Sequence, residues 1–109
     1  MQDCIFCHIL AGTLPATVVY QNQWWIVIKD INPQAAVHLL IIAKEHLESF
    51  AELTSLHAEA LLQLPQTVRE VALLQQVSSY RLITNIGADA GQTVPHLHWH
   101  FLAGEVLDA

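Results

Sequence analysis

The sequence predicts an α+β domain: an antiparallel sheet of about five strands, one long helix and a short N-terminal helix. Three observations indicate this class. Short β-rich runs are separated by turn residues, one long segment carries leucines at 56, 61, 64, 73 and 74, and a run near the C-terminus alternates histidine with apolar residues. The length of 109 residues suits a single domain, 1–109, with one hydrophobic core.

The first half of the chain is expected to form a short helical turn and then three strands. The predicted elements cover residues 4–10, 17–20, 24–28 and 37–43, with a hairpin turn at 21–23 and a second turn at 30–33. The helical turn should end near Gly12. The third strand, from Val37 to Ala43, is apolar at nearly every position, so it is expected to be covered on both faces.

The second half is expected to hold one long helix and two further strands. Thr54 or Ser55 can cap this helix, which should run to about Val77. Pro65 lies inside it and should kink the helix or split it in two, because proline cannot donate the helical hydrogen bond. The fourth strand is predicted at 80–85, and a glycine-bracketed loop at 87–93 leads into the histidine run.

The histidine run at 96–100 reads His-Leu-His-Trp-His. Because side chains alternate faces along a strand, His96, His98 and His100 should project from one side, roughly 7 Å apart and within reach of one small ligand. Leu97, Trp99 and Phe101 should point the other way, into a core. An ordinary solvated strand face has no reason to choose histidine each time, so the run is interpreted as a functional site.

Two kinds of chemistry fit such a row of imidazoles. One is a metalloenzyme in which His96, His98 and His100 surround a catalytic metal. The other is phosphoryl or nucleotidyl transfer, with one imidazole as nucleophile and a neighbour holding the phosphate. Gly91, Gln92 and Thr93 offer backbone N–H groups and a hydroxyl beside the row, and such a loop can cradle a phosphate. This loop favours the second interpretation.

Charge and composition limit the classes of partner. The formal charge of −6 comes from four basic and ten acidic residues, without the basic stripe that a nucleic acid polymer needs. A small anion is still compatible. No apolar run is long enough to cross a membrane, and the N-terminus lacks a signal peptide, so a cytoplasmic location is expected. The apolar content of 53% suggests that some surface is buried against a partner chain.

The two cysteines, Cys4 and Cys7, form a C-x-x-C pair. In a cytoplasmic protein a structural disulfide is not expected. With His8 the pair also spells the haem-attachment pattern, which we reject because it needs export and a second axial ligand. A thioredoxin-like redox pair is a weak alternative, since no βαβ unit surrounds it. Zinc remains and needs two further ligands; the alternative is a pair of buried free thiols.

Taken together, these motifs resemble a known family. The run His96-Leu-His-Trp-His-Phe-Leu matches the motif of the histidine triad superfamily of nucleotide hydrolases and transferases. The chain looks most like its branch of small histidine triad nucleotide-binding proteins, which hydrolyse purine nucleoside phosphoramidates. The similarity extends from Cys4 to Gly104 and includes Cys-Ile-Phe-Cys at 4–7, Leu-Pro-Ala at 14–16, Asp-Ile-Asn-Pro-Gln-Ala at 30–35, His38, Ala-Lys-Glu-His at 43–46, Asn85, Gly87 and Gly-Gln-Thr-Val at 91–94.

The resemblance implies a role for each matching residue. His98 would attack the α-phosphorus and form a covalent nucleotidyl-histidine that water resolves. His100 would donate to a phosphate oxygen, His38 would orient the triad, and His96 completes the catalytic set. Asp30 would bind the ribose hydroxyls. The remaining substrate contacts would come from Asn85, Gly91, Gln92 and Thr93 around the phosphate and leaving group, and from Ile5, Phe6, Ile9 and Ile31 around the purine.

The resemblance also implies a cofactor and a quaternary structure. Relatives with the C-x-x-C pair look like zinc proteins, and the matching ligands here are Cys4, Cys7, His46 and His96. Such a closed site is structural, and no catalytic metal is expected. The family resemblance implies a homodimer joined by the long helices and by sheet edges. Alternative functions are dinucleoside polyphosphate hydrolysis with the same nucleophile, or a nucleotide-sensing adaptor without catalysis.

Overall fold

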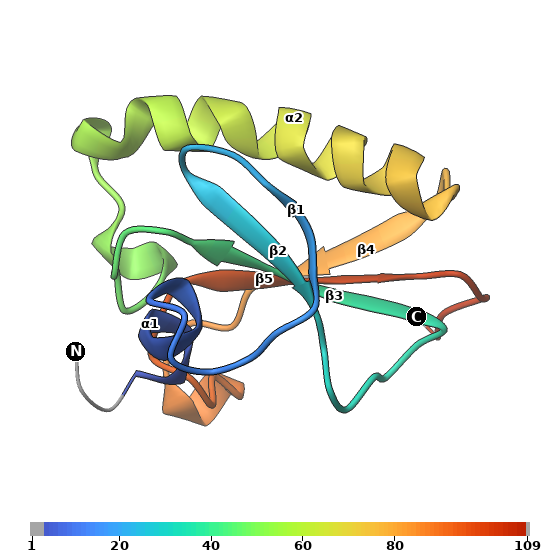
Figure 1. The fold of residues 1–109 in the computed structure, drawn as a ribbon, viewed down its shortest axis with the longest axis horizontal. Helices are drawn as coiled ribbons and strands as arrows, with labels where there is room; N and C mark the ends of the chain where they lie inside the picture. Colours follow the sequence, from blue (N-terminus) through green and yellow to red (C-terminus); the bar gives the residue numbers. More distant parts are fainter. Residues whose placement is uncertain (1–3, 109) are drawn as a thin grey trace.

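A five-stranded antiparallel sheet with one helix on each face forms the body of the molecule (Figure 1). The computed structural model describes residues 4–108. Along the chain the main elements are α1 (Ile5–Leu10), β1 (Val18–Gln21), β2 (Trp25–Lys29), β3 (Val37–Ala43), α2 (Ala58–Gln75), β4 (Tyr80–Ile83) and β5 (His98–Ala103). Three short 3₁₀ turns lie at Phe50–Glu52, Ser55–His57 and Ala88–Ala90. The predicted α+β class, with about five strands, one long helix and a short N-terminal helix, is confirmed.

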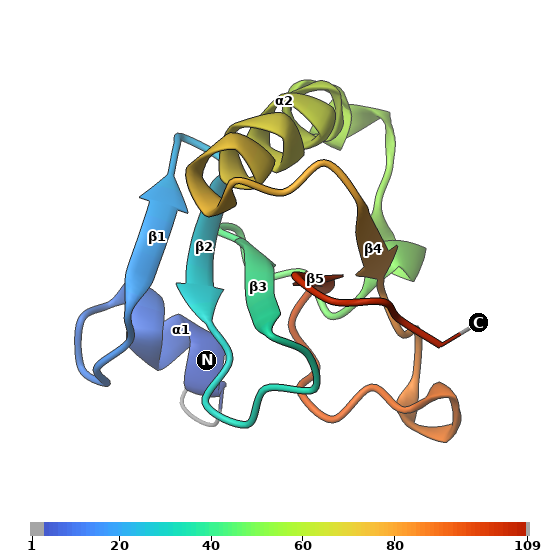
Figure 2. The same cartoon turned by 90° about the vertical axis from the view of Figure 1, so that its right-hand side faces the viewer.

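The order of strands across the sheet is β1-β2-β3-β5-β4, so β3 lies at the centre (Figure 2). Leu39 and Ile41 of β3 are buried on the face that α2 covers. Leu40 and Ile42 are buried on the opposite face, against α1. The prediction that this apolar strand is covered on both sides is therefore confirmed.

The helix α2 differs from the prediction at Pro65. The helix is one uninterrupted element from Ala58 to Gln75 with Pro65 inside it, so the expected split is wrong. Pro65 lies on the exposed side, where water can satisfy the carbonyl that proline leaves without a donor. On the buried side, Val68 and Val71 pack continuously against the sheet.

The start of α2 is capped close to the predicted position. Thr54 caps the Ser55–His57 turn that precedes α2: its hydroxyl accepts the Leu56 N–H, and His57 Nδ1 accepts the Thr54 N–H. This reciprocal arrangement is a capping box.

Strand boundaries shift near the histidine run. β5 begins at His98 rather than His96, and β4 ends at Ile83, so Asn85 lies in the loop that follows. Leu97 hydrogen-bonds with Leu47 and Ala43, its N–H donating to the Leu47 carbonyl. This contact holds the start of the run against the loop after β3. Within residues 4–108, no helix combines the length and the apolar character needed to cross a membrane.

Candidate active site and metal cluster

A pocket of about 700 Å³ opens between α1 and the sheet, a size typical of small-molecule sites, which span roughly 300–1,000 Å³. Its wall is mainly apolar, with His98, His100, Asp30 and Thr93 among its polar members. The lining residues are Ile5, Phe6, Ile9, Leu14, Pro15, Ala16, Thr17, Ile28, Lys29, Asp30, Ile31, Leu40, Thr93, Val94, His98 and His100.

His98 is buried at the start of β5, with one ring nitrogen already engaged. Its Nδ1 lies 2.7 Å from the His96 carbonyl oxygen. Because a carbonyl can only accept, Nδ1 carries the proton and Nε2 keeps its lone pair. Burial lowers the pKa of His98, although the hydrogen bond to His96 and the charge of Asp30 oppose that shift. His98 is therefore held as a neutral imidazole.

His100 is held in the opposite tautomer by a chain of hydrogen bonds. The Gln34 N–H donates to His38 Nδ1 at 2.9 Å, so His38 carries its proton on Nε2. That Nε2 lies 2.9 Å from His100 Nδ1, which must accept. His100 is then protonated on Nε2. Burial, followed by the neighbouring His98 and His38, lowers the pKa of His100.

The two histidines thus offer complementary groups next to each other. The ring centroids of His98 and His100 are 5.2 Å apart, closer than the roughly 7 Å that an ideal strand predicts for neighbours on one face. One ring has a lone pair on Nε2 and the other an N–H. A nucleophile beside a hydrogen-bond donor is an arrangement that phosphoryl chemistry can use.

Asp30 follows β2 and lines the pocket next to His38. Its Oδ1 accepts the Asn32 N–H at 2.7 Å, and its Oδ2 lies 3.4 Å from His38 Nε2. Asp30, His38 and His100 lie close enough to hold a cation. However, the proton on His38 Nε2 occupies the position that a metal ion would need, because Nδ1 already accepts from Gln34.

Of the predicted substrate residues, the pocket contains Ile5, Phe6, Ile9, Asp30, Ile31 and Thr93. Asn85, Gly91 and Gln92 lie in the neighbouring loop and do not line it. The Gln92 side chain braces this loop: Oε1 accepts the Gly87 N–H, and Nε2 donates to the carbonyls of Glu48 and Val94.

Several pocket residues were not predicted to contact substrate, although Leu14, Pro15 and Ala16 belong to the segments that resemble the family. Leu40 is one of them, and a signal for it exists in the strand register. Leu40 pairs with His100 across β3 and β5, so the two side chains share one face of the sheet. Leu14, Pro15, Ala16 and Thr17 come from the segment before β1, where no periodic pattern marks them.

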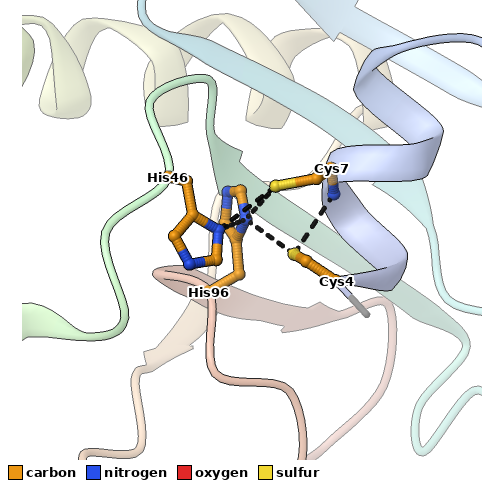
Figure 3. A group of neighbouring side chains, drawn as sticks. All are labelled: Cys4, Cys7, His46 and His96. Carbon is orange, nitrogen blue, oxygen red and sulfur yellow. Dashed lines mark hydrogen bonds between the residues drawn. The ribbon is translucent and has the colours of Figure 1, made fainter. Parts of the chain in front are cut away.

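His96 does not reach the pocket, and the expectation that three imidazoles reach one ligand is wrong. Its side chain is fully buried, with 0% exposed. Its Nε2 lies 2.7 Å from the Ala43 carbonyl, so Nε2 carries the proton and Nδ1 keeps the lone pair. That Nδ1 faces Cys4 and Cys7 of the N-terminal segment, together with His46 (Figure 3).

The distances within this Cys/His cluster (Cys4, Cys7, His46 and His96) fit a tetrahedral metal site. His96 Nδ1 lies 3.2 Å from Cys4 Sγ, 3.6 Å from Cys7 Sγ and 3.1 Å from His46 Nδ1. Ligand atoms around zinc are expected about 3.3–3.8 Å apart, given its bond lengths to nitrogen and sulfur. Two of the three distances are slightly shorter, so these side chains would move apart by a few tenths of an ångström at most to surround an ion. The cysteines are not joined in a disulfide.

The positions of the protons on the two histidine rings are also compatible with metal binding. The His96 Nε2–H bond to the Ala43 carbonyl is the arrangement by which an outer group fixes a ligating histidine. His46 Nε2 is buried and has no hydrogen-bond partner among residues 4–108, while its Nδ1 points at Cys7 Sγ, 3.1 Å away. Two thiols and two imidazoles form the donor set of a closed structural zinc site.

Comparison with known proteins gives consistent matches over nearly the whole chain. A family model described as "Scavenger mRNA decapping enzyme C-term binding" matches residues 3–106. An uncharacterized HIT-like protein of Synechococcus elongatus is 37% identical over 107 residues, 97% of this chain and 94% of that protein. Protein HitA of Neisseria gonorrhoeae is also 37% identical over 107 residues, 97% of this chain and 100% of its own length.

Solved structures give the same result. A HIT family hydrolase from Clostridium thermocellum superposes with a TM-score of 0.95 at 42% identity, covering 100% of this chain and 96% of that one. A histidine triad protein from Clostridium difficile superposes with a TM-score of 0.93 at 33% identity, with the same two coverages.

Proposed function

This chain belongs to the histidine triad (HIT) superfamily, and we propose that it hydrolyses purine nucleoside phosphoramidates or related nucleotidyl bonds. The observation that carries the proposal is the pair of opposite tautomers at His98 and His100, facing a largely apolar pocket that also contains a carboxylate. The similarity to the HIT family hydrolase of Clostridium thermocellum supports hydrolysis as the general activity.

In the first step, His98 Nε2 attacks the α-phosphorus. A nitrogen–phosphorus bond forms as the bond to the leaving amine breaks, giving a covalent nucleotidyl-histidine. The Nδ1–H bond to the His96 carbonyl keeps the attacking lone pair on Nε2 and stabilises the positive charge that develops on the ring. Splitting hydrolysis into two displacements lets a buried neutral imidazole replace water as the first nucleophile.

The neighbouring groups hold the phosphate during both steps. His100 donates its Nε2–H to a phosphate oxygen, and His38 holds the His100 ring in that tautomer. Thr93 at the pocket wall, with Gly91 and Asn85 beside it, contacts the phosphate and leaving group. Water then cleaves the nitrogen–phosphorus bond. One water is consumed overall. Its hydroxyl ends on phosphorus, and its proton replaces the one that the amine takes up when it leaves.

The nucleoside occupies the apolar part of the pocket. Ile5, Phe6, Ile9 and Ile31 surround the purine, and Asp30 accepts from the ribose hydroxyls. Asp30 Oδ2 lies next to His38 Nε2, so ribose and reacting phosphorus are brought to adjacent parts of the site. Binding energy from the nucleoside then positions the phosphorus at His98.

Turnover measurements distinguish the possible functions. An adenosine phosphoramidate should be hydrolysed faster than a dinucleoside polyphosphate at equal concentration. The reverse order would favour dinucleoside polyphosphate hydrolysis through the same nucleophile. Nucleotide binding without turnover of either compound would indicate a sensing adaptor. Loss of activity on treatment with a chelator that leaves the zinc of the Cys/His cluster in place would favour the metalloenzyme alternative, in which the histidine row holds a catalytic metal.

The Cys/His cluster is proposed to hold a structural zinc ion. Cys4, Cys7, His46 and His96 would be its four ligands, which leaves no coordination position for water. When bound, the ion supplies a crosslink between the N-terminal segment and the sheet and takes no part in the reaction. The fit of the donor atoms and the His96 tautomer supports this assignment.

The active form is proposed to be a homodimer. The outer side of α2 exposes Leu62 and Leu73, which are 75% and 73% exposed. These residues are eleven positions apart, or about three helical turns, so they share one face. β4 is an edge strand, and its Tyr80 and Leu82 are also exposed. A second copy of the chain would cover these apolar groups.

A further inference from the structure

The short helix α1 belongs to two candidate ligand sites at once. Cys4 at its N-cap and Cys7 in its first turn contribute sulfur atoms to the Cys/His cluster. Ile5, Phe6 and Ile9 line the pocket that contains His98. A single helix of six residues therefore forms a shared wall between the cluster and the nucleotide pocket. Figure 3 shows the cluster side of this wall, where Cys4 and Cys7 extend from the helix towards His46 and His96.

A helix this short does not hold its own conformation in water, because nucleation is costly and few hydrogen bonds follow. The position of α1 depends on the side chains that dock it. Phe6 and Cys4 are each only 5% exposed, and they pack on the sheet face formed by Ile26, Ile28, Leu40 and Ile42. Any interaction that holds Cys4 and Cys7 in place also holds Phe6, which lies between them.

Phe6 contacts a histidine from each site. Its ring meets His96 edge-on at a centroid distance of 5.8 Å and His98 at 5.0 Å. The same two histidines are joined through the backbone, because His98 Nδ1–H donates to the His96 carbonyl. The ring of the proposed nucleophile is therefore held from two sides by groups that also belong to the Cys/His cluster or touch it.

We propose that Phe6 is a positioning residue that couples the two sites, so that metal in the Cys/His cluster tightens nucleotide binding. This inference rests on the proposed function, because it takes the ligand of the pocket to be a purine nucleotide. Docked α1 is the state that both ligands favour, and an undocked α1 binds each of them less well. Coupling of this kind is reciprocal, so nucleotide must tighten metal binding by the same factor.

The test measures both affinities in the full, untagged chain. The zinc dissociation constant, from competition with a chelator, should fall by about fivefold or more when AMP saturates the pocket. The AMP dissociation constant should fall by the same factor between metal-stripped and zinc-loaded protein. Neither readout depends on turnover.

Two variants of α1 test whether Phe6 carries the coupling between the zinc and AMP sites. Phe6→Leu keeps an apolar side chain but removes the ring, and should reduce the coupling factor to less than about twofold while both ligands still bind. If circular dichroism shows that Phe6→Leu does not fold, Phe6→Met serves the same comparison. Ile5→Ala is the matched control: Ile5 lines the pocket from the same helix but is half exposed. This variant should bind AMP more weakly yet keep the full coupling factor.

The outcomes separate this inference from the proposed function. Binding of zinc and AMP without coupling in the wild type would overturn only the inference. Equal coupling factors in the wild type and in Phe6→Leu would overturn the role of Phe6. Failure of the wild type to bind AMP at all would overturn the proposed function and, with it, the coupling.

Discussion

His98 and His100 lie two residues apart on one strand, and their hydrogen-bond partners alone make them chemically different. A backbone carbonyl places the proton of His98 on Nδ1, and the Gln34–His38 chain places that of His100 on Nε2. The strand alternation predicts that they share a face. It cannot predict their tautomers, because that of His98 depends on the His96 carbonyl and that of His100 on the Gln34 N–H from the loop before β3.

The residue at position 98 should decide catalysis with little effect on binding. His98→Asn removes the attacking lone pair but keeps an N–H donor near the position of Nδ1, which bonds the His96 carbonyl, so turnover of adenosine phosphoramidate should fall by at least about a thousandfold. The AMP dissociation constant, measured by calorimetry, should change by less than about threefold. His57→Asn, at the capping box outside the pocket, is the control and should retain wild-type turnover. Near-normal turnover in His98→Asn would contradict the nucleophile assignment.

His100 should make folding stability sensitive to acid. Its pKa is lowered in the folded state by burial and by His98 and His38, while Asp30 opposes the shift. The unfolded chain therefore takes up a proton at a higher pH than the folded protein. The stabilisation is complete above about pH 6.5 and is lost as the pH falls towards the folded pKa. The free energy of unfolding in urea should fall less between pH 7.5 and 5.5 in His100→Gln than in the wild type. An equal or steeper fall in the variant would refute this.

Among the elements, the start of the histidine run, at His96, departs most from prediction. Periodicity correctly places Leu97, Trp99 and Phe101 in the core under α2. It extends the strand to His96, but that residue leaves the ladder because its ring packs among Cys4, Cys7 and His46. The fold, the four residues of the Cys/His cluster and part of the pocket wall could thus be predicted. The resemblance places His96 both among the metal ligands and in the catalytic set, and the structure brings it only to the Cys/His cluster. Periodicity alone could not separate the histidine row into two sites, since that separation depends on contacts between distant segments.

The cluster should hold metal only with both cysteines present. Untagged protein should contain about one zinc per chain by elemental analysis. Cys7→Ser should lose most of this metal and melt several degrees lower, because α1 loses a crosslink to the sheet. Cys7 is the better position to change, since it is less buried than Cys4. Wild-type protein without zinc, and with both thiols freely titratable, would contradict the assignment.

Pro65 should be a source of instability within α2. Pro65→Ala restores a donor in the middle of an uninterrupted helix on its exposed side, so the free energy of unfolding should rise by about 1 kcal/mol or more. Gln66→Ala, at the next exposed position, is the control and should change it by less than about 0.5 kcal/mol. A variant no more stable than this control would show that the helix already accommodates proline without cost.

At the scale of the whole molecule, the two faces of the sheet have different roles, one in stability and one in ligand binding. The α2 face contains the larger core, including Trp25, Trp99 and Phe101. The α1 face contains the pocket and the Cys/His cluster. The outer side of α2 and the free edge of β4 leave apolar side chains exposed, and neither belongs to a site described above. This division is consistent with a dimer that leaves the pocket accessible.

The dimer should depend on the exposed leucines of α2. Sedimentation of the wild type should give twice the chain mass, and the double variant Leu62→Asp with Leu73→Asp should sediment as a monomer. Leu56→Asp is the control, because Leu56 is 92% exposed but precedes α2; it should leave the mass unchanged. A monomeric wild type at micromolar concentration, or a double variant that still dimerises, would contradict this interface.

The most direct test of the account is to trap the covalent intermediate. Wild-type protein mixed with adenosine phosphoramidate and quenched in alkali, where phosphohistidine-type bonds survive, should gain the mass of one adenylyl group. Peptide mapping should place that group on His98. An adduct on another residue, or rapid multiple turnover in which no adduct forms at any quench time, would contradict the proposed mechanism.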